Sequence, residues 1–529
     1  MSKSVLIHTY DNSEKVKQIA KTLDQENQII HLNGLIGSSL TFVLQALFKK
    51  TEKPFLVVLN DKEEAAYYLN DLEQLIGETD VLFYPGSYRR PYQIEDTNNA
   101  NVLLRAEVLN RLNSRKKPAV IVTYPEALFE KVVTKKEFEK NTLKVAVGDK
   151  ISIDFINEVL FEYEFKRVDF ITEPGEFSVR GGIIDVFSFS NDNPYRIEFF
   201  GNEVDSIRSF DVATQLSIEK EKKITIIPNV ENKFFQENRE SFLDYINEKT
   251  ILFIQNSDLL LSKLDSLFSK AEEVFQKLEG TIKHIAPQHL FLNQKEFIKG
   301  ALNLSVVELS SKPIFRVKKT VDFHILPQPS FNKQFDLLLN NLSDNHFNGI
   351  TNYLFCSNEN QANRFHDIFE EIDEENHENI KKQYNTVVFP LFQGFIDEEN
   401  QIACYTDHQI FERYHKFNIK NGYSKKQTIT LKELTTLSVG DYVTHIDHGI
   451  GKFGGLQKIQ VEGKTQEAIK LVYADNDIVY VSIHSLHKIS KYNGKDGAPP
   501  KIYKLGSNAW KVLKQKTKAR VKHIAFNLI

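Results

Sequence analysis

Residues 55–86 read FLVVLNDKEEAAYYLNDLEQLIGETDVLFYPG, and their pattern decides the fold class of the start of the chain. The apolar run 55–59 precedes a segment of helical character, 63–76, and a second apolar run, 81–84, which a Pro-Gly pair ends. A predicted helix over 98–112 and a predicted strand over 119–123 continue the alternation. Buried apolar strands that alternate with helices are typical of a parallel sheet. The stretch therefore predicts an α/β layer.

The pattern changes several times along the chain, which predicts a multidomain α/β protein. Residues 141–215 hold short, often alternating strands, and Gly201 and Asn202 lie between two of them as a hairpin signal. We interpret this part as a smaller α+β domain inserted into an α/β domain made of residues 1–140 and 216–340. After it we predict a second small α/β domain, a polar linker, a glycine-punctuated β-barrel-like module and a helix, over residues 341–415, 416–433, 434–500 and 501–529.

Composition excludes several classes of protein. At 529 residues the chain is too long for one core of about 100–150 residues. A net charge of −4 gives no overall basic field for nucleic acid, although a local patch is not excluded. The two cysteines, Cys356 and Cys404, lie in apolar runs and are interpreted as reduced core thiols. No apolar run approaches the ~20 residues of a membrane span, and we expect a cytoplasmic protein.

Segment 34–41 has the place of a phosphate-binding loop, because it follows the strand-like run 29–32 and opens a helix. In a working loop, backbone N–H groups hold phosphate and a lysine reaches the terminal phosphates. Here Leu40 stands at the lysine position, so the positive charge is missing. A chance turn and a decayed nucleotide site both fit, and we expect that ATP does not bind. The residues concerned are Gly34, Gly37, Ser38, Ser39, Leu40 and Thr41.

Two longer motifs give the chain a resemblance to a known family. Residues 170–187, FITEPGEFSVRGGIIDVF, closely resemble the inserted domain shared by the excision-repair protein UvrB and the bacterial transcription-repair coupling factors, the Mfd family. Residues 439–451, VGDYVTHIDHGIG, resemble the polymerase-binding module of the coupling factors, which is related to CarD-like proteins and which UvrB lacks. The decayed loop lies where UvrB has its ATP loop. The resemblance spans nearly the whole chain and points to the N-terminal half of a coupling factor.

This resemblance implies a scaffold that binds a stalled RNA polymerase and recruits UvrA for transcription-coupled nucleotide excision repair. In the family an ATP-dependent DNA translocase follows, with ATP and Mg as cofactors and DNA as its main partner. Its motifs are absent from these 529 residues, so we expect no catalysis and no cofactor here. Two alternatives remain: a UvrB-type helicase subunit, which an intact loop lysine would support, and a CarD-like transcription regulator, which would bind DNA in a salt-dependent manner.

The resemblance also implies two sets of contact residues. UvrA is expected to dock on the inserted domain at Arg167, Phe177 and Arg180, since arginine and aromatic side chains are favoured anchors of interfaces. The β subunit of RNA polymerase is expected to pair with an edge strand of the C-terminal module, because an exposed edge offers unpaired N–H and C=O groups. The residues implied there are Lys458, Ile459, Gln460, Val461 and Tyr480. A core position for Ile459 is the alternative.

Two further patterns have simpler interpretations than the chemistry they suggest. His445, Asp447, His448, His484 and His487 could supply zinc ligands. We interpret the first three as a turn in which side chains hydrogen-bond the backbone, and expect no metal. The predicted helix 508–529 carries many lysines and an apolar stripe, which fits a connector into a translocase better than a DNA-binding arm.

Overall fold

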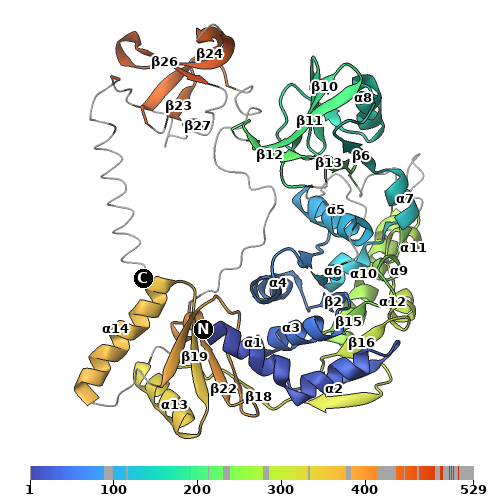
Figure 1. The fold of residues 1–529 in the computed structure, drawn as a ribbon, viewed down its shortest axis with the longest axis vertical. Coiled ribbons are helices and arrows are strands. Elements are labelled where there is room, and N and C mark those ends of the chain that lie inside the picture. The colour runs from blue at the N-terminus through green and yellow to red at the C-terminus, as the bar shows by residue number, and fades with distance from the viewer. Residues whose placement is uncertain are drawn as a thin grey trace. The chain divides into compact units, whose positions relative to one another are not determined.

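The computed structural model describes residues 2–87, 99–114, 117–189, 191–212, 214–229, 239–277, 285–331, 334–376, 383–413, 437–445, 447–461, 464–482, 489–492, 500, 502, 504–505 and 510. Its contacts divide the chain into two compact units, Met1–Lys140 with Val230–Asn421, and Asn141–Asn229 with Gly422–Ile529 (Figure 1). The predicted linker 416–433 and nearly all of the predicted helix 508–529 lie outside the described residues.

A seven-stranded parallel sheet forms the centre of the first unit, in the order β17-β1-β16-β15-β2-β4-β3. Its strands are β1 (Ile29–Asn33), β2 (Phe55–Val58), β3 (Val81–Phe83), β4 (Val120–Thr123), β15 (Ile251–Ile254), β16 (Ser305–Glu308) and β17 (Lys319–Asp322). The inner strands β2, β4, β15 and β16 are buried along their whole length, because helices cover both faces. The predicted α/β layer with a parallel sheet is confirmed.

Helices lie on both faces of this sheet. α3 and α4 lead from one strand to the next in one direction along the sheet, whereas α5 and α10 to α12 lead in the other, so right-handed crossovers place the two groups on opposite faces. Asp61 caps the N-terminus of α4, and its side chain accepts the Glu64 N–H. The helices are α1 (Ser2–Asn12), α2 (Glu14–Leu23), α3 (Ser39–Thr51), α4 (Lys62–Ile76), α5 (Asn99–Ser114), α6 (Pro125–Phe129), α7 (Lys135–Lys140), α9 (Phe242–Tyr245), α10 (Ser257–Lys277), α11 (Pro287–Leu290) and α12 (Gln294–Ala301). A short ribbon pairs β5 (Val132–Val133) with β14 (Arg239–Glu240).

The small α/β domain belongs to the same unit and has a five-stranded sheet in the order β18-β21-β22-β19-β20. Its elements are β18 (Ile325–Pro327), α13 (Phe335–Phe347), β19 (Thr351–Cys356), α14 (Glu359–Asn376), β20 (Tyr384–Val388), β21 (Phe395–Asp397), β22 (Ile402–Thr406) and α15 (Asp407–Ile410). The predicted start at residue 341 is wrong, because β18 already pairs with β21. The three-residue strand ends in proline and gives no strand signal in the sequence.

The inserted domain is built on a six-stranded sheet in the order β12-β11-β10-β9-β8-β7, in which only β7 and β8 run parallel. Its elements are β6 (Leu143–Ala146), α8 (Ile153–Glu162), β7 (Lys166–Arg167), β8 (Glu176–Arg180), β9 (Ile183–Val186), β10 (Tyr195–Phe200), β11 (Glu203–Phe210), β12 (Ser217–Glu221) and β13 (Lys223–Ile226). The predicted hairpin at Gly201 is confirmed, with φ of +64° at that glycine.

The predicted end of the inserted domain at residue 215 is wrong. β12 extends the sheet beside β11, and β13 pairs with β6, so the domain continues through Ile226. β12 is an exposed edge strand of sequence SIEKE. Such a strand needs no apolar alternation, because neither face of it is buried in the core.

The C-terminal module, residues 437–492, is an antiparallel five-stranded sheet in the order β26-β25-β24-β23-β27. Its strands are β23 (Tyr442–His445), β24 (Gly449–Val461), β25 (Lys464–Val472), β26 (Ile478–Ser482) and β27 (Ile489–Lys491), with a short 3-10 turn at Ala474–Asn476. Val443, Ile469 and Leu471 lie at the centre of its core. Across the described parts of the whole chain, every helix falls short of the length or the apolar character that a membrane span requires.

Candidate functional site

The segment with the place of a phosphate loop connects β1 to α3. Gly34 and Gly37 adopt positive φ of +80° and +57°, and the helix begins at Ser39. Leu40 is buried in the core, which explains why a leucine is accepted at this position. The Thr41 hydroxyl donates to the Ser38 carbonyl oxygen at 2.7 Å, so it serves the turn itself.

The backbone of this turn is already engaged by the small α/β domain. The Ser38 N–H, which a working loop would turn toward phosphate, donates to the Gln393 carbonyl oxygen at 3.1 Å. A Cβ atom added at Gly37 would lie 3.1 Å from the Cβ of Gln393. Polypeptide therefore occupies the space in front of the turn.

The inserted sheet has an apolar face and a charged face, as the alternation of its strands requires. On the apolar side α8 packs through Ile156 and Leu160. On the other side the register aligns Ser178, Asp185, Arg196 and Arg208 across four neighbouring strands. The charged face thus crosses the domain from β8 to β11.

A buried carboxylate organises the charged face. Arg196 donates twice to Asp185, at 2.7 Å and 2.9 Å, and Arg180 contacts the same carboxylate from β8. The hydrogen bond to Asp185 raises the pKa of Arg196 above its ordinary value, so the guanidinium group stays charged. The Arg180 side chain remains 42% exposed, whereas that of Asp185 is 2% exposed. Arg180 is therefore both fixed in position and accessible to a partner.

The three residues expected to bind UvrA do not form one surface. Phe177 is completely buried and packs edge-on against Phe161 at 5.2 Å, so its predicted role as a surface contact is wrong. Arg167 is exposed on the edge strand β7 and pairs beside Phe177, which places it on the opposite side of the sheet from Arg180. Two arginines remain accessible, on different faces.

Phe200 is an exposed aromatic side chain that the sequence did not single out. It lies at the β10–β11 turn and is 85% exposed. The Phe199 N–H donates to the Gly182 carbonyl oxygen at 2.8 Å, which brings this turn beside the β8–β9 turn that follows Arg180. An exposed aromatic ring and an accessible arginine thus lie at the same end of the sheet. The sequence signal was an apolar pair directly before a Gly-Asn turn, where the second residue has no core position.

β24 of the C-terminal module presents a strand edge. Its first half pairs with both β23 and β25, whereas from Leu456 onward it pairs with β25 alone among the described strands. A β-bulge with one extra residue separates the halves, and Gly455 there has φ of +91°. The sequence runs 456–461 and 468–473 predict two paired strands, and β24 and β25 do pair, but residues 456–461 lie opposite 464–469 rather than 468–473. The backbone of Lys458, Ile459, Gln460 and Val461 lies on this one-sided segment.

Ile459 and Tyr480 lie on the same face of the module. The Tyr480 hydroxyl donates to the Gln457 side chain at 3.2 Å, and Ile459 is two residues further along β24. Tyr480 is 44% exposed, and Ile459 is half-buried and lies outside the module's core cluster. The alternative that Ile459 is a core residue is therefore not supported.

His445 serves the turn that follows β23. Its Nδ1 accepts the N–H groups of Asp447 and His448 at 3.1 Å and 3.3 Å, as the interpretation of a backbone-bonded turn requires. That nitrogen has no lone pair left for a metal. His484 and His487 lie outside the described residues, and within the described ones no group of three or more potential ligands gathers. Cys356 and Cys404 are free, buried thiols as predicted, and burial raises the pKa of Cys356 to about 12.

Comparison with known proteins identifies both domains. Residues 143–232 match the UvrB interaction domain, and residues 437–493 match the CarD-like/TRCF RID domain. The chain therefore combines two kinds of domain in one polypeptide, a UvrB interaction domain and a CarD-like domain.

More extended similarity runs to proteins named transcription-repair-coupling factor. Those of Bacillus subtilis, Rickettsia typhi and Haemophilus influenzae are 26%, 25% and 24% identical over 98%, 92% and 96% of this chain. The chain covers 49%, 48% and 49% of these relatives, so it spans about half the length of the curated relatives it matches. The two domain matches and this extended similarity confirm the resemblance to the coupling factors that the sequence motifs indicate.

Proposed function

We propose that this chain is a scaffold that holds two partners, UvrA on its inserted domain and RNA polymerase on its C-terminal module, for transcription-coupled nucleotide excision repair. The proposal rests on the observation that both of these domains lie in one chain. A UvrB interaction domain bears an accessible, fixed arginine, and a CarD-like module bears a strand edge that pairs on one side only.

For UvrA, the proposed surface is the end of the inserted sheet that carries Arg180 and Phe200. The guanidinium group is already oriented by Asp185 and lies over the Phe170 ring at 5.3 Å, so little side-chain entropy is lost when a partner carboxylate binds. Phe200 adds apolar area beside the charge. Arg167 belongs to a separate contact at the β7 edge, and Phe177 supports β8 from the core.

For RNA polymerase, the proposed contact is strand addition of its β subunit to residues 456–461 of β24. The bulge at Gly455 turns this segment away from β23, which leaves its outer N–H and C=O groups without a partner strand in the described module. Ile459 would contact a side chain of the added strand, and Tyr480, on β26, would support β24 through its hydrogen bond to Gln457.

In this proposal the chain itself performs no reaction. ATP hydrolysis with Mg and translocation on DNA belong to the remaining half of the coupling factors, where the family has its translocase. The occupied turn at Ser38 supports this division, because its N–H already donates to Gln393.

A reciprocal binding experiment tests the proposal. The 529-residue chain is immobilised and incubated separately with UvrA and with RNA polymerase core enzyme. We expect Arg180→Glu to lose UvrA and to keep polymerase, and Ile459→Arg to lose polymerase and to keep UvrA. Circular dichroism of both variants checks that they are folded, and each variant serves as the control for the other. Retention of both partners by both variants would remove these residues from the surfaces.

A further inference from the structure

The turn at Ser38 and the loop 391–394 of the small α/β domain form a reciprocal backbone contact. The Ser38 N–H donates to the Gln393 carbonyl oxygen at 3.1 Å, and the Gln393 N–H donates back to the Ser38 hydroxyl at 2.9 Å. Ser38 is completely buried. Both donors and both acceptors are thus satisfied across the junction, as buried polar groups require.

Asp71 on α4 ties the same two segments together. Its carboxylate is 1% exposed and accepts the Ser38 hydroxyl at 2.6 Å and the Phe392 N–H at 3.0 Å. A buried carboxylate without such donors would be strongly unfavourable. The loop therefore stabilises the buried Asp71 by supplying a donor, and Asp71 in turn fixes the position of the loop.

Aromatic side chains close the junction. The Phe392 ring stacks on Tyr67 with centroids 4.1 Å apart and planes 8° from parallel. The Tyr68 hydroxyl donates to the Gly37 carbonyl oxygen at 3.1 Å, and its ring meets Phe392 edge-on. Both tyrosines are almost fully buried. Stacked pairs of this kind contribute energy beyond the area they bury.

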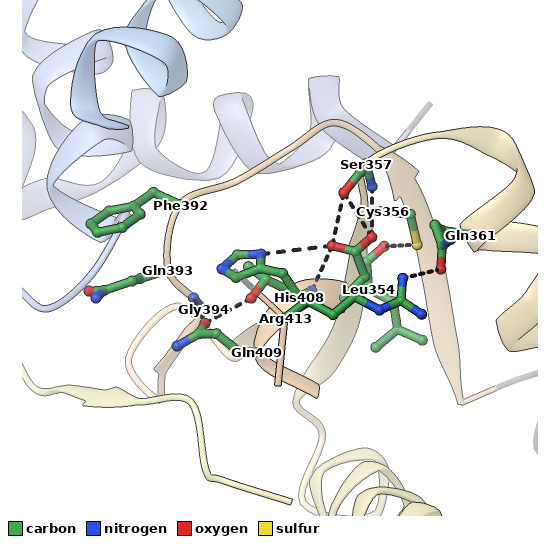
Figure 2. A network of polar contacts seen from close by, with 12 residues as sticks. Leu354, Cys356, Ser357, Gln361, Phe392, Gln393, Gly394, His408, Gln409 and Arg413 are labelled. Atoms are coloured by element: carbon green, nitrogen blue, oxygen red, sulfur yellow. Dashed lines mark hydrogen bonds and ion pairs between the residues drawn. The ribbon is translucent and has the colours of Figure 1, made fainter. Parts of the chain in front are cut away.

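The loop is also fixed from the side of its own domain, as Figure 2 shows. The Gly394 N–H donates to the Gln409 side chain at 2.7 Å, and Thr406 donates to the same oxygen at 2.8 Å. A Cβ atom at Gly394 would lie 2.5 Å from the backbone carbonyl oxygen of Cys404, so only glycine fits. The loop therefore meets the turn as a preformed projection and loses little entropy on docking.

We propose that the former phosphate loop is now an internal receptor, and that the loop 391–394 is its built-in ligand. We call this contact between the turn and the loop the lock. In it, the Gln393 carbonyl oxygen accepts the Ser38 N–H that would donate to phosphate in a working loop, and the Asp71 carboxyl group accepts from both Ser38 and Phe392. The lock fastens the small α/β domain to the parallel-sheet domain. The small α/β domain would then stabilise the parallel-sheet domain into which the inserted domain is built. This role does not depend on which partners bind elsewhere.

Hydrogen exchange on the whole chain tests the lock, because a mutation on one side should expose amides on the other. We expect Ser38→Ala to speed exchange of the amides of residues 391–394 by about tenfold or more, since Gln393 loses its acceptor. Phe392→Ala should in turn speed exchange at residues 36–39. The two variants change the contact from opposite sides. If one of them does not fold, hydrogen exchange in the other still tests the lock.

Ser257→Ala is the matched control. Ser257 is also completely buried and also donates to a carboxylate, that of Glu308 at 2.5 Å, but in a different part of the same unit. It should lower stability by a similar amount without a selective change at residues 391–394. If Ser38→Ala affects those amides no more than Ser257→Ala does, or if Phe392→Ala leaves residues 36–39 unchanged, the lock does not exist.

Discussion

At the scale of single residues, Asp185 determines which arginines of the inserted domain are structural and which are available. Arg196 holds the buried carboxylate with two short hydrogen bonds and lies over the Phe210 ring at 4.5 Å. Arg180 contacts the same carboxylate but is 42% exposed. The same residue type thus has two roles on β8 and β10, the strands on either side of Asp185, and the sequence alone does not distinguish these roles.

This difference predicts unequal losses of stability. We expect Arg196→Ala to destabilise the domain by about 3 kcal/mol, because Asp185 stays buried and loses its main partner. Arg180→Ala should cost about 1 kcal/mol or less, since the Arg180 side chain is partly exposed to solvent and Arg196 still pairs with Asp185. Urea unfolding of the two variants measures the difference. Equal losses would show that Arg180 is as structural as Arg196 and less suited to bind a partner.

Phe200 gives a second prediction at this scale. We expect Phe200→Ala to leave the free energy of unfolding within about 0.5 kcal/mol, because the ring is exposed, and to weaken UvrA binding about tenfold. Phe347→Ala is the matched control, since that ring is 91% exposed on α13 of the small α/β domain. Titration of UvrA against both variants decides between them, and an unchanged affinity for the Phe200 variant would exclude the ring from the surface.

At the scale of elements, α4 and the turn before α3 share a titratable group whose charge matters for stability. Burial raises the pKa of Asp71 from its ordinary 3.8 to about 8, against the hydrogen bonds from Ser38 and Phe392, which lower it. The folded chain therefore keeps a proton that the unfolded chain releases. The contribution of this group to stability is complete below about pH 4 and is lost as the pH rises through 8.

A pH series tests this assignment. We expect the free energy of unfolding to fall between about pH 4 and pH 8, by at most about 1.4 kcal/mol per pH unit from Asp71, and Asp71→Asn to flatten that slope. Asp265→Asn, at an exposed position on α10, should leave the slope unchanged. An unaltered slope in the Asp71 variant would show that the carboxylate is ionised in the folded protein throughout this range.

The elements that the sequence predicted correctly are those with a strong local signal. The apolar runs of the parallel sheet, the hairpin at Gly201 and the pairing of β24 with β25 each follow from periodicity or turn chemistry. β12 and β18 were not predicted, because exposed edge strands need no apolar pattern. Phe177 was misplaced because a motif gives the identity of a residue but not the face of the strand on which it lies.

At the scale of the whole molecule, the sequence identified both binding domains but not the contact at Ser38. That contact joins residues more than 350 positions apart through backbone groups, which leave no trace in composition or spacing. Long, specific motifs supplied the identity of the domains, whereas the accessible residues and the internal lock required the fold. The kinds of domain were therefore predictable from the sequence, and the exposed residues of their surfaces only in part.

The central claim is that one chain holds both partners at once, and a bridging assay tests it most directly. UvrA is immobilised, RNA polymerase is added, and polymerase retention is measured with and without the 529-residue chain. We expect retention only when the chain is present, and its loss with either Arg180→Glu or Ile459→Arg. Retention that is independent of the chain, or a chain that captures each partner alone but never both together, would contradict the account.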